Sequence, residues 1–504
     1  MHEIKTSGLR LLDALGRERI FHGMNLKADD TGKAEFGKLK LLDEEFFRRS
    51  AALGFNVLRL GIHWESLEPE KGKLNEGLLR RVDEIFATAE KHGMYVFLDM
   101  HQDVYGGMPE WTRITDGIKW PKKTRFVWAE GYFWGRAVHR AFDNFWDNTP
   151  TQGKGLQDHF AELWQILARR YADSPAFFGF DLLNEPFPGK DGGKAFRKLV
   201  CKLVRVAAVS PTVNRIEFIR NAMGKQTRNR VLDVLTPEVL YKVTQGGAAE
   251  KLHNEFYNEK YSPFIAKMSE AIREITPKGL VFVEHSYFSN IAVPFTAKLP
   301  EGEAVCYSPH GYDFTVDTPA YAFANNARVK AIFDENLRAQ RRLNVPVLVG
   351  EWGAGYMGEK CFPHIEFLAD LFDAYNWSFA YFTYTEGMYD TAETEILVRP
   401  YPVAVNGEIK GYSYDSSTGT FTLEFTQPAD ADSSLPTEIY LPRAAESVEA
   451  EGFEWWEKEI LPGVKWIVSP KEEGEAPREI MSTGRMLLLI GGGAGEHRIM
   501  VKLM

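Results

Sequence analysis

The chain has 504 residues, of which 44% are hydrophobic and 26% are charged, so it is long enough for a large folded domain and a smaller second one. The formal net charge of −10 argues against a nucleic-acid partner, because phosphates require a basic surface. This charge leaves contact with lipid open, since burial of apolar groups can drive such contact without basic residues.

The sequence indicates no cofactor, and no metal site follows from its cysteines or acidic residues. Cys201, Cys306 and Cys361 are odd in number and widely spaced, and the pair Asp29-Asp30 is too sparse for a cation site. The N-terminus lacks a basic segment followed by an apolar one, and no stretch approaches the roughly 18–20 apolar residues of a membrane span. We therefore expect a soluble, cytoplasmic protein, or a secreted one if a leader has been removed.

Eight predicted strands lie between residues 20 and 385, and most are followed by an amphipathic helical pattern such as Leu42–Leu53, Leu78–His92, Leu156–Tyr171 or Pro263–Ile275. Eightfold strand–helix alternation closes most economically as a (β/α)8 TIM barrel. A doubly wound open sheet is the alternative, but no glycine-rich phosphate loop opens the first helix. The predicted strands are Ile20–Leu26, Asn56–Leu60, Met94–Met100, Phe177–Asn184, Leu280–Glu284, Ala304–Ser308, Val345–Gly350 and Phe379–Tyr384.

Two long insertions interrupt the predicted barrel, at about 105–155 and about 189–261. Loops of this length in a compact domain are usually lids or binding surfaces. The second insertion is helical in pattern and partly basic. The aromatics of the first could cover a binding cleft, where flat rings stack on sugars or line an apolar channel, or they could pack as a local core. They are Trp111, Trp120, Phe126, Trp128, Tyr132, Phe133, Trp134, Phe142, Phe145 and Trp146.

After Tyr401 the sequence changes to short segments in which apolar and polar residues alternate, such as 412–414, 421–425, 438–441 and 465–468. Turn signals separate these segments. The pattern predicts an antiparallel β-sandwich. We therefore divide the chain into a catalytic barrel, 1–400, and a β-sandwich domain, 401–504.

Two glutamates stand at the C-terminal ends of predicted strands four and seven, Glu185 in Asn184-Glu185-Pro186 and Glu351 in Glu351-Trp352-Gly353. In α/β barrels this end of the strands carries the chemistry. Two carboxylates roughly 5 Å apart can cleave a glycosidic bond with retention of configuration. One such glutamate alone would more often be a helix cap or a salt-bridge partner, but the pair predicts a sugar-cleaving enzyme.

The two carboxylates need different protonation states. An acid catalyst must keep its proton near neutral pH, so Glu185 requires an apolar or negatively charged surrounding that raises its pKa. Glu351, ionised, supplies such a charge and can act as the nucleophile. Once Glu351 is esterified, Glu185 can ionise and act as the base for water. The Asn184 amide is well placed to hydrogen-bond a sugar 2-hydroxyl.

These motifs resemble glycoside hydrolase family 5 (clan A), a retaining (β/α)8 family, with Asn184-Glu185-Pro186 carrying the acid/base and Glu351-Trp352-Gly353 the nucleophile. The stretch 59–64 resembles the second-strand Arg motif, and 99–103 the third-strand His motif. The resemblance implies that Arg59 holds the nucleophile ionised, and that His101 and Asp103 bind substrate. His310-Gly311-Tyr312 resembles the sixth-strand His-x-Tyr, in which the tyrosine hydrogen-bonds the nucleophile.

Within this family, the chain shows a finer resemblance to the endoglycoceramidases and their glucosylceramidase relatives. The longer third-strand motif 99–105, Asn25-Leu26-Lys27 and the junction 399–402 carry this resemblance. It implies that Lys27 contacts sugar and that the substrate is a glycolipid, with transient contact to a membrane or micelle. The tryptophan expected under the sugar on strand eight is replaced, so Phe382 or Tyr384, on one face by period two, is expected to stack there.

Three other functions stay open at this point. A β-glucosidase acting on sterol or aryl glucosides would also need an apolar aglycone site. An endo-β-1,4-glucanase would share every catalytic residue but would have an open polar cleft with spaced tryptophans. A catalytically inactive sugar- or lipid-binding protein would keep the fold, although here both glutamates and Asn184 are present.

Overall fold

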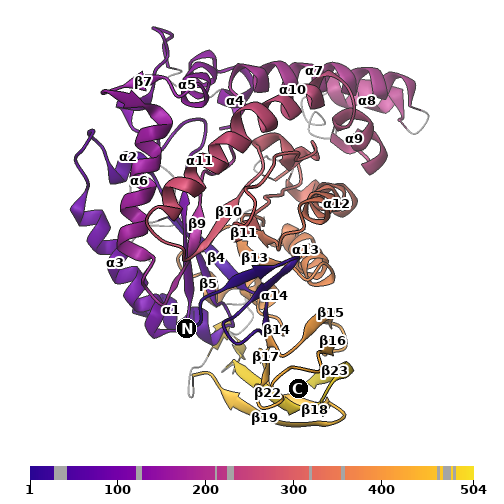
Figure 1. Ribbon diagram of the computed structural model, residues 1–504. Coiled ribbons are helices and arrows are strands. Elements are labelled where there is room, and N and C mark those ends of the chain that lie inside the picture. The colour runs from indigo at the N-terminus through magenta and orange to yellow at the C-terminus, as the bar shows by residue number, and fades with distance from the viewer. Residues whose placement is uncertain are drawn as a thin grey trace.

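The computed structural model shows a barrel with surrounding helices and, beneath it, a body of antiparallel strands (Figure 1). The predicted fold, a (β/α)8 barrel followed by an antiparallel β-sandwich, is confirmed. No helix in the described part of the chain is long and apolar enough to cross a membrane. The structure describes residues 1–27, 42–120, 128–210, 213–223, 232–316, 321–353, 358–461, 466–468, 478–480 and 484–504.

The barrel is a sheet of eight parallel strands, closed by a parallel bridge between Tyr307 and Val347. Its strands are buried along almost their whole length, which explains why their sequences are apolar runs without alternation. All eight predicted strands are present, with ends that differ by up to three residues. They are β4 (His22–Lys27), β5 (Val57–Ile62), β6 (Tyr95–Met100), β9 (Phe177–Asp181), β10 (Leu280–Val283), β11 (Val305–Tyr307), β12 (Leu348–Val349) and β13 (Ser378–Tyr381).

Amphipathic helices cover the barrel, as predicted, and each buries one face against the strands. Three begin at side-chain caps: the Asp43 carboxylate accepts a hydrogen bond from the Phe46 N–H, the Asn75 side chain accepts one from the Leu78 N–H, and the Asn325 side chain accepts one from the Arg328 N–H. The helices are α1 (Glu44–Ala52), α2 (Trp64–Leu67), α3 (Glu76–Lys91), α6 (Leu156–Tyr171), α11 (Ser262–Arg273), α12 (Asn326–Leu343), α13 (Phe362–Ala374) and α14 (Ala392–Leu397).

The first insertion holds the hairpin strands β7 (Pro150–Thr151) and β8 (Lys154–Gly155) and the helices α4 (Glu130–Trp134) and α5 (Arg136–Trp146). Most of its aromatics pack as a local core, the second of the two sequence interpretations, since four are at most 6% exposed and three are partly buried. Phe126 lies outside the described residues. Of the aromatics that the structure describes here, two face solvent, Trp128 at 40% and Trp134 at 58% exposed. The buried four are Tyr132, Phe142, Phe145 and Trp146, and the partly buried ones are Trp111, Trp120 and Phe133.

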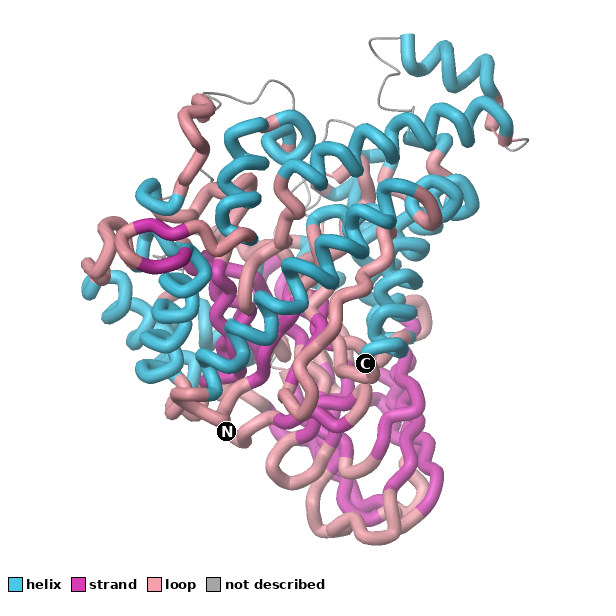
Figure 2. Tube along the Cα trace, turned by 45° about the horizontal axis from the view of Figure 1, so that its top comes forward, coloured by secondary structure: helices cyan, strands magenta, loops and turns pink. Residues whose placement is uncertain are grey.

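The second insertion is helical, as the sequence predicted. It forms an arm along the edge of the molecule farthest from the C-terminal strands (Figures 1 and 2). Its described helices are α7 (Lys190–Val209), α8 (Arg215–Met223), α9 (Pro237–Thr244) and α10 (Ala248–Phe256), followed by a π-helical turn, η4 (Tyr257–Tyr261).

Two antiparallel sheets enclose the second core, which contains Val405, Leu423 and Leu487. One sheet runs β1-β2-β3-β14-β17-β22-β19 and the other β15-β16-β23-β18. The first three strands of the chain therefore belong to this domain, whereas the sequence analysis assigned them to the barrel, residues 1–400. The strands of these two sheets are β1 (Lys5–Ser7), β2 (Arg10–Leu12), β3 (Glu18–Arg19), β14 (Tyr401–Val405), β15 (Glu408–Asp415), β16 (Thr420–Gln427), β17 (Thr437–Leu441), β18 (Ala445–Glu449), β19 (Phe453–Glu459), β22 (Arg485–Gly491) and β23 (Gly495–Leu503). Strands β20 (Trp466–Val468) and β21 (Arg478–Ile480) pair with each other in a separate two-stranded sheet.

Candidate active site

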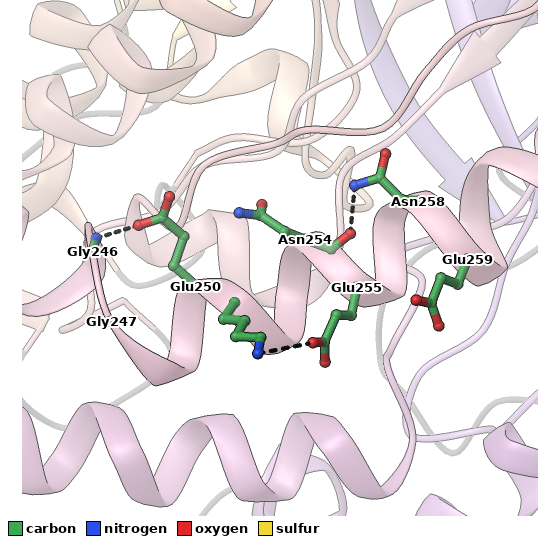
Figure 3. Close-up of a pocket in the computed structure, with 8 residues that line it drawn as sticks. Gly246, Gly247, Glu250, Asn254, Glu255, Asn258 and Glu259 are labelled. Atoms are coloured by element: carbon green, nitrogen blue, oxygen red, sulfur yellow. Dashed lines mark hydrogen bonds and ion pairs between the residues drawn. The ribbon is translucent and has the colours of Figure 1, made fainter.

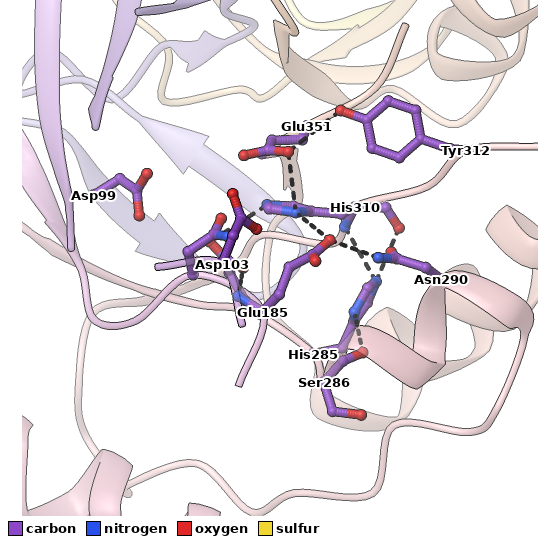
Figure 4. Close-up of polar contacts among 12 residues, drawn as sticks. Asp99, Asp103, Glu185, His285, Ser286, Asn290, His310, Tyr312 and Glu351 are labelled. Atoms are coloured by element: carbon purple, nitrogen blue, oxygen red, sulfur yellow. Dashed lines mark hydrogen bonds and ion pairs between the residues drawn. The ribbon is translucent and has the colours of Figure 1, made fainter. Parts of the chain in front are cut away.

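The two predicted catalytic glutamates meet at the C-terminal end of the barrel. Glu185 follows β9 with a positive φ of 39°, a conformation that is uncommon outside glycine, and Glu351 follows β12. One oxygen of each carboxylate and one nitrogen of His310 lie within 4.8 Å of one another (Figure 4). This separation is that of a retaining glycosidase, because an inverting pair would lie roughly 6.5–9.5 Å apart to admit a water.

Arg59, in the middle of β5 and fully buried, connects the strand ends. Its guanidinium binds four carboxylates and two side-chain amides that come from different strands, so one cation holds the site together. Because the surrounding negative charges outweigh the effect of burial, the pKa of Arg59 is raised well above its usual value. Its partners are Glu284 at 2.6 Å, Glu351 at 2.7 Å, Asp181 at 2.8 Å, Asn25 and Asn184 at 3.0 Å each, and Asp99 at 3.1 Å.

Glu351 is held by both of its oxygens. Arg59 Nη1 donates to Oε1 at 2.7 Å, and the Tyr312 hydroxyl donates to Oε2 at 3.3 Å. His310 Nδ1 lies 3.7 Å from Oε2. Donors on both oxygens stabilise the carboxylate and fix its direction, which is what a nucleophile requires. The structure thus brings Arg59 and Tyr312 to the carboxylate that the sequence assigned them to, whereas His310, predicted only as a substrate-binding residue, lies between the two glutamates.

Glu185 lies in a different environment. Burial raises its pKa to about 7; the hydrogen bond and charge of His310 act in the opposite direction, and the charge of Glu351 adds to the rise. The Asn290 amide donates to Oε1 at 2.6 Å, and His310 Nδ1 lies 3.2 Å from the same oxygen. A carboxyl with a pKa near neutrality can carry a proton to a leaving group and take one back from water.

Glu284, directly after β10, is a residue of this site that the sequence did not single out. Its Oε2 accepts the backbone N–H of Glu185 at 2.7 Å, and its Oε1 binds Arg59 at 2.6 Å and lies 3.3 Å from His310 Nε2. Although burial raises its pKa, the charges of His310 and Arg59 prevail and lower it to about 2. Burial lowers the pKa of His310, but Glu284 and Glu351 raise it well above the usual value. Glu284 thus connects the backbone of Glu185 to the charged side chains of Arg59 and His310.

Asn290, in the short helix η5 (Tyr287–Ile291), was also not predicted. Its contact with Glu185 joins residues 105 positions apart, and nothing in its local sequence distinguishes it. Glu284 had a visible signal, because a charged residue that ends an apolar strand faces the catalytic end of a barrel. Asp181, whose pKa burial and Glu284 raise well above the usual value, is the last residue of β9.

Some of the predicted substrate-binding residues line a small pocket beside Arg59. They are Lys27, His101 and Phe382, and six neighbours complete the lining. His101 Nδ1 lies 2.7 Å from Asp99 Oδ2, and its Nε2 lies 3.3 Å from Asp103 Oδ2. Burial and Lys27 lower the pKa of His101, but Asp99 and Asp103 raise it to about 9. The neighbours are Asn25, Leu26, Arg59, Gly61, Asp99 and Thr383.

Of the two aromatics proposed for sugar stacking, only Phe382 lines this pocket. Tyr384 is 8% exposed and packs between Phe46 and Tyr389, at ring-centroid distances of 4.9 and 4.6 Å. The amide of Asn184 is held by the protein: its Oδ1 accepts from Arg59 at 3.0 Å and its Nδ2 donates to the Gln102 carbonyl at 2.9 Å. Each amide atom retains capacity for a second hydrogen bond.

Two other clusters resemble ligand sites. Asp99, Asp181 and Glu284 place carboxylate oxygens within 4.8 Å of one another, but the guanidinium of Arg59 lies among them and already supplies the positive charge. An open groove along α10 is lined by Glu250, Glu255, Glu259 and their neighbours (Figure 3). Two of its carboxylates are engaged within the groove, with the Gly246 N–H and with Lys251.

Comparison with known proteins places this geometry in context. The family model described as cellulase (glycosyl hydrolase family 5) matches residues 12–235 and 246–387, and the one described as glycoside hydrolase family 5 C-terminal domain matches 399–476. An endoglycoceramidase of Hydra vulgaris is 32% identical over 212 residues, which are 36% of this chain and 39% of that protein. The match to an endoglycoceramidase of Cyanea nozakii spans 41% of that protein, so both matches cover about two fifths of the relatives' length.

Two further relatives are matched over most of their length. Endoglycoceramidase I of Rhodococcus hoagii is 25% identical over 461 residues, covering 87% of this chain and 79% of that protein. The structure of endo-glycoceramidase II from Rhodococcus sp. with ganglioside GM3 superposes with a TM-score of 0.68 at 22% identity, covering 99% of this chain and 100% of that one. The superposition shows that the fold is shared along the whole chain.

Proposed function

The chain belongs to glycoside hydrolase family 5, and from this premise we propose that it is a retaining β-glycosidase that cleaves the bond between a glycan and a ceramide. One observation carries the proposal: two carboxylates whose oxygens lie within 4.8 Å, one held by donors on both oxygens and the other with a pKa near 7. Such a pair is the minimal machinery for double displacement at an anomeric carbon.

The first step attaches the sugar to the enzyme. A Glu351 oxygen attacks the anomeric carbon while the bond from that carbon to the aglycone oxygen breaks, and Glu185 transfers its proton to the departing oxygen. The products of this step are the free alcohol and an ester between Glu351 and the sugar. Esterification removes the negative charge of Glu351, so the pKa of Glu185 falls and this residue is ready to accept a proton.

The second step releases the sugar. Glu185 accepts a proton from water, the water oxygen attacks the anomeric carbon, and the ester bond to Glu351 breaks. Two inversions leave the configuration retained. Arg59 and Tyr312 receive the carboxylate as it forms again, at the distances they already hold. No group beyond the chain's own side chains and water enters either step.

The glycolipid substrate is supported by two observations. Two relatives that match most of this chain are named endoglycoceramidase I, of Rhodococcus hoagii, and glucosylceramidase, of Cryptococcus neoformans. In addition, Trp128 lies on the rim next to Tyr287, with ring centroids 6.1 Å apart, and is 40% exposed. An exposed aromatic at the mouth suits an apolar aglycone and transient contact with a membrane or micelle surface.

A side-by-side hydrolysis assay in detergent tests the substrate. We expect release of sugar from glucosylceramide or lactosylceramide and little from soluble cello-oligosaccharides. Glucose released only from the first substrate would mark an exo-acting glucosylceramidase, and intact lactose from the second an endoglycoceramidase. If sterol or aryl glucosides are cleaved in preference to both ceramide substrates, the natural aglycone is another apolar group and not ceramide. Cleavage of cello-oligosaccharides alone would refute the lipid substrate.

A further inference from the structure

The helical arm α7–α8 carries an apolar surface that no other described element covers. Six of its side chains are large, apolar and 43–81% exposed, and we call them the arm patch. On a folded protein, exposed apolar residues in such number mark an interaction surface. The arm patch consists of Val200, Val204 and Val209 on α7, and Ile216, Ile219 and Met223 on α8.

The spacing of these residues is that of a helix face. Ile216, Ile219 and Met223 stand at positions i, i+3 and i+7 of α8, so all three lie on one side of it. Ile216 and Met223 are 81% and 80% exposed. In a helix that packs on a core, this spacing defines the buried side. On α8 this side faces solvent, so it is available as a surface for binding a partner.

The arm is basic although the chain as a whole is acidic. Residues 190–223 contain eight lysines and arginines against two acidic residues, a net charge of +6 in a chain of −10. Arg197 stands three and seven positions before Val200 and Val204, so cationic and apolar side chains share one face of α7. Arg205, Arg215 and Arg220 are exposed as well. Apolar residues bordered by arginine and lysine are typical of helices that lie in the interface of an anionic membrane.

The arm patch is connected to the mouth of the active site. Helix α7 begins five residues after Glu185. Phe196 of α7 contacts Phe133 and Trp134 at ring-centroid distances of 4.2 and 5.0 Å, and Trp134 is 58% exposed. Phe133 in turn lies 6.1 Å from Tyr287, in the helix whose Asn290 binds Glu185. The first turns of α7 therefore border the catalytic opening, and the arm patch begins at Val200, one turn further along the same helix.

From this apolar face, its positive charge and its continuity with the mouth, we propose that the arm docks the enzyme on an anionic lipid bilayer. The arm patch inserts between headgroups, and the arginines and lysines of α7 and α8 pair with lipid phosphates and carboxylates. This inference rests on the proposed function in one respect, since a bilayer is where a glycolipid substrate would be presented. The charge favours a lipid surface over an uncharged apolar partner protein.

Binding to vesicles tests the docking without any turnover. The full-length protein is sedimented with vesicles of phosphatidylcholine containing about one third phosphatidylserine, and with vesicles of phosphatidylcholine alone. We expect affinity for the anionic vesicles that falls with added salt. The variant I216S/I219S/M223S should bind at least about tenfold more weakly, since its insertion surface is removed. The variant R197Q/R205Q should bind the anionic vesicles more weakly, and its binding to vesicles of phosphatidylcholine alone should not change.

A matched control comes from the opposite end of the molecule. Trp455 and Trp456 of β19 are 46% and 43% exposed, comparable to the arm patch (Figure 1). W455S/W456S should bind vesicles like the unmodified protein. Unchanged binding of the α8 variant, or a loss of binding in the tryptophan variant instead, would overturn the proposal, as would binding that is equal with and without phosphatidylserine.

Activity separates this inference from the proposed function. The α8 variant should hydrolyse a soluble aryl glycoside at the unmodified rate, which shows that the barrel is intact, and should lose activity on glycolipid embedded in vesicles. If the protein binds anionic vesicles through the arm but cleaves no glycolipid in them, the docking stands and the ceramide substrate fails. If it cleaves glycolipid in vesicles equally well with and without the arm patch, the docking fails and the substrate stands.

Discussion

Replacement of Glu185 by alanine provides a detailed test of the acid role. Burial raises the pKa of this carboxyl to about 7, and its protonated form is the active one for attack on a poor leaving group. The rate should therefore be high below pH 7 and fall as the pH rises through 7. At pH 8 only about a tenth of the enzyme would carry the proton, so kcat/KM should drop about tenfold per pH unit on the alkaline side.

The assay compares two substrates that differ in leaving group. Glu185→Ala should lower kcat/KM by about 10²–10⁴ on an alkyl β-glycoside, whose oxygen must be protonated as it leaves. On a dinitrophenyl β-glycoside, which needs no proton, kcat/KM should stay close to the unmodified value while kcat falls, because water loses its base in the second step. In the variant, the alkyl β-glycoside should lose the alkaline limb of kcat/KM near pH 7, whereas kcat/KM for the dinitrophenyl β-glycoside should show no such limb in either enzyme. Glu185→Gln, which keeps the side-chain volume, should show the same changes as Glu185→Ala on both substrates.

Two results would refute this reasoning. Equal losses of kcat/KM on both substrates would show that Glu185 does not protonate the leaving group. An alkaline limb near pH 7 that persists in the variant would assign that titration to another residue. Circular dichroism of the variant separates either result from a failure to fold.

Three further predictions concern neighbouring residues. Asp103→Asn should move the alkaline limb to lower pH, since the Asp103 charge contributes to the raised pKa of Glu185; a shift to higher pH would contradict the electrostatics. Glu284→Gln should lower kcat/KM by about 10–100-fold and lower the free energy of unfolding in urea by about 3–5 kcal/mol, because it breaks a buried ionic contact with Arg59. If kcat/KM and the free energy of unfolding both equal those of the unmodified enzyme, Glu284 does not support the site. Phe382→Ala should raise KM for soluble glycosides, whereas Tyr384→Ala should mainly lower stability, by about 3–5 kcal/mol, because its ring packs between Phe46 and Tyr389; the reverse pattern would place the stacking ring at Tyr384.

The sequence could predict the barrel because parallel strands are buried on both faces. A run such as Phe177–Asp181 is apolar for this reason, and eight of them in order leave few alternatives. It could also predict the two glutamates, since each ends such a run. The strands β1, β2 and β3 are only two or three residues long, too short for any alternation to show, so their place in the C-terminal sheet was missed.

Other parts of the site depend on contacts between distant strands. Glu284 looks in sequence like any glutamate after a strand, and its importance comes from Arg59, 225 positions away, and from the backbone of Glu185. Period two placed Phe382 and Tyr384 on one face, but the chain leaves the strand at Tyr381, so the alternation no longer applies and the two rings separate. Aromatic content alone likewise did not distinguish the packed Phe145 from the exposed Trp134.

The stereochemistry of hydrolysis tests the central claim most directly. Proton NMR during cleavage of an aryl β-glycoside identifies the anomer that forms first, before mutarotation. With the oxygens of Glu185 and Glu351 within 4.8 Å, double displacement predicts the β-anomer. The α-anomer as first product would mean a single displacement by water, and would contradict the assignment of Glu351 as nucleophile.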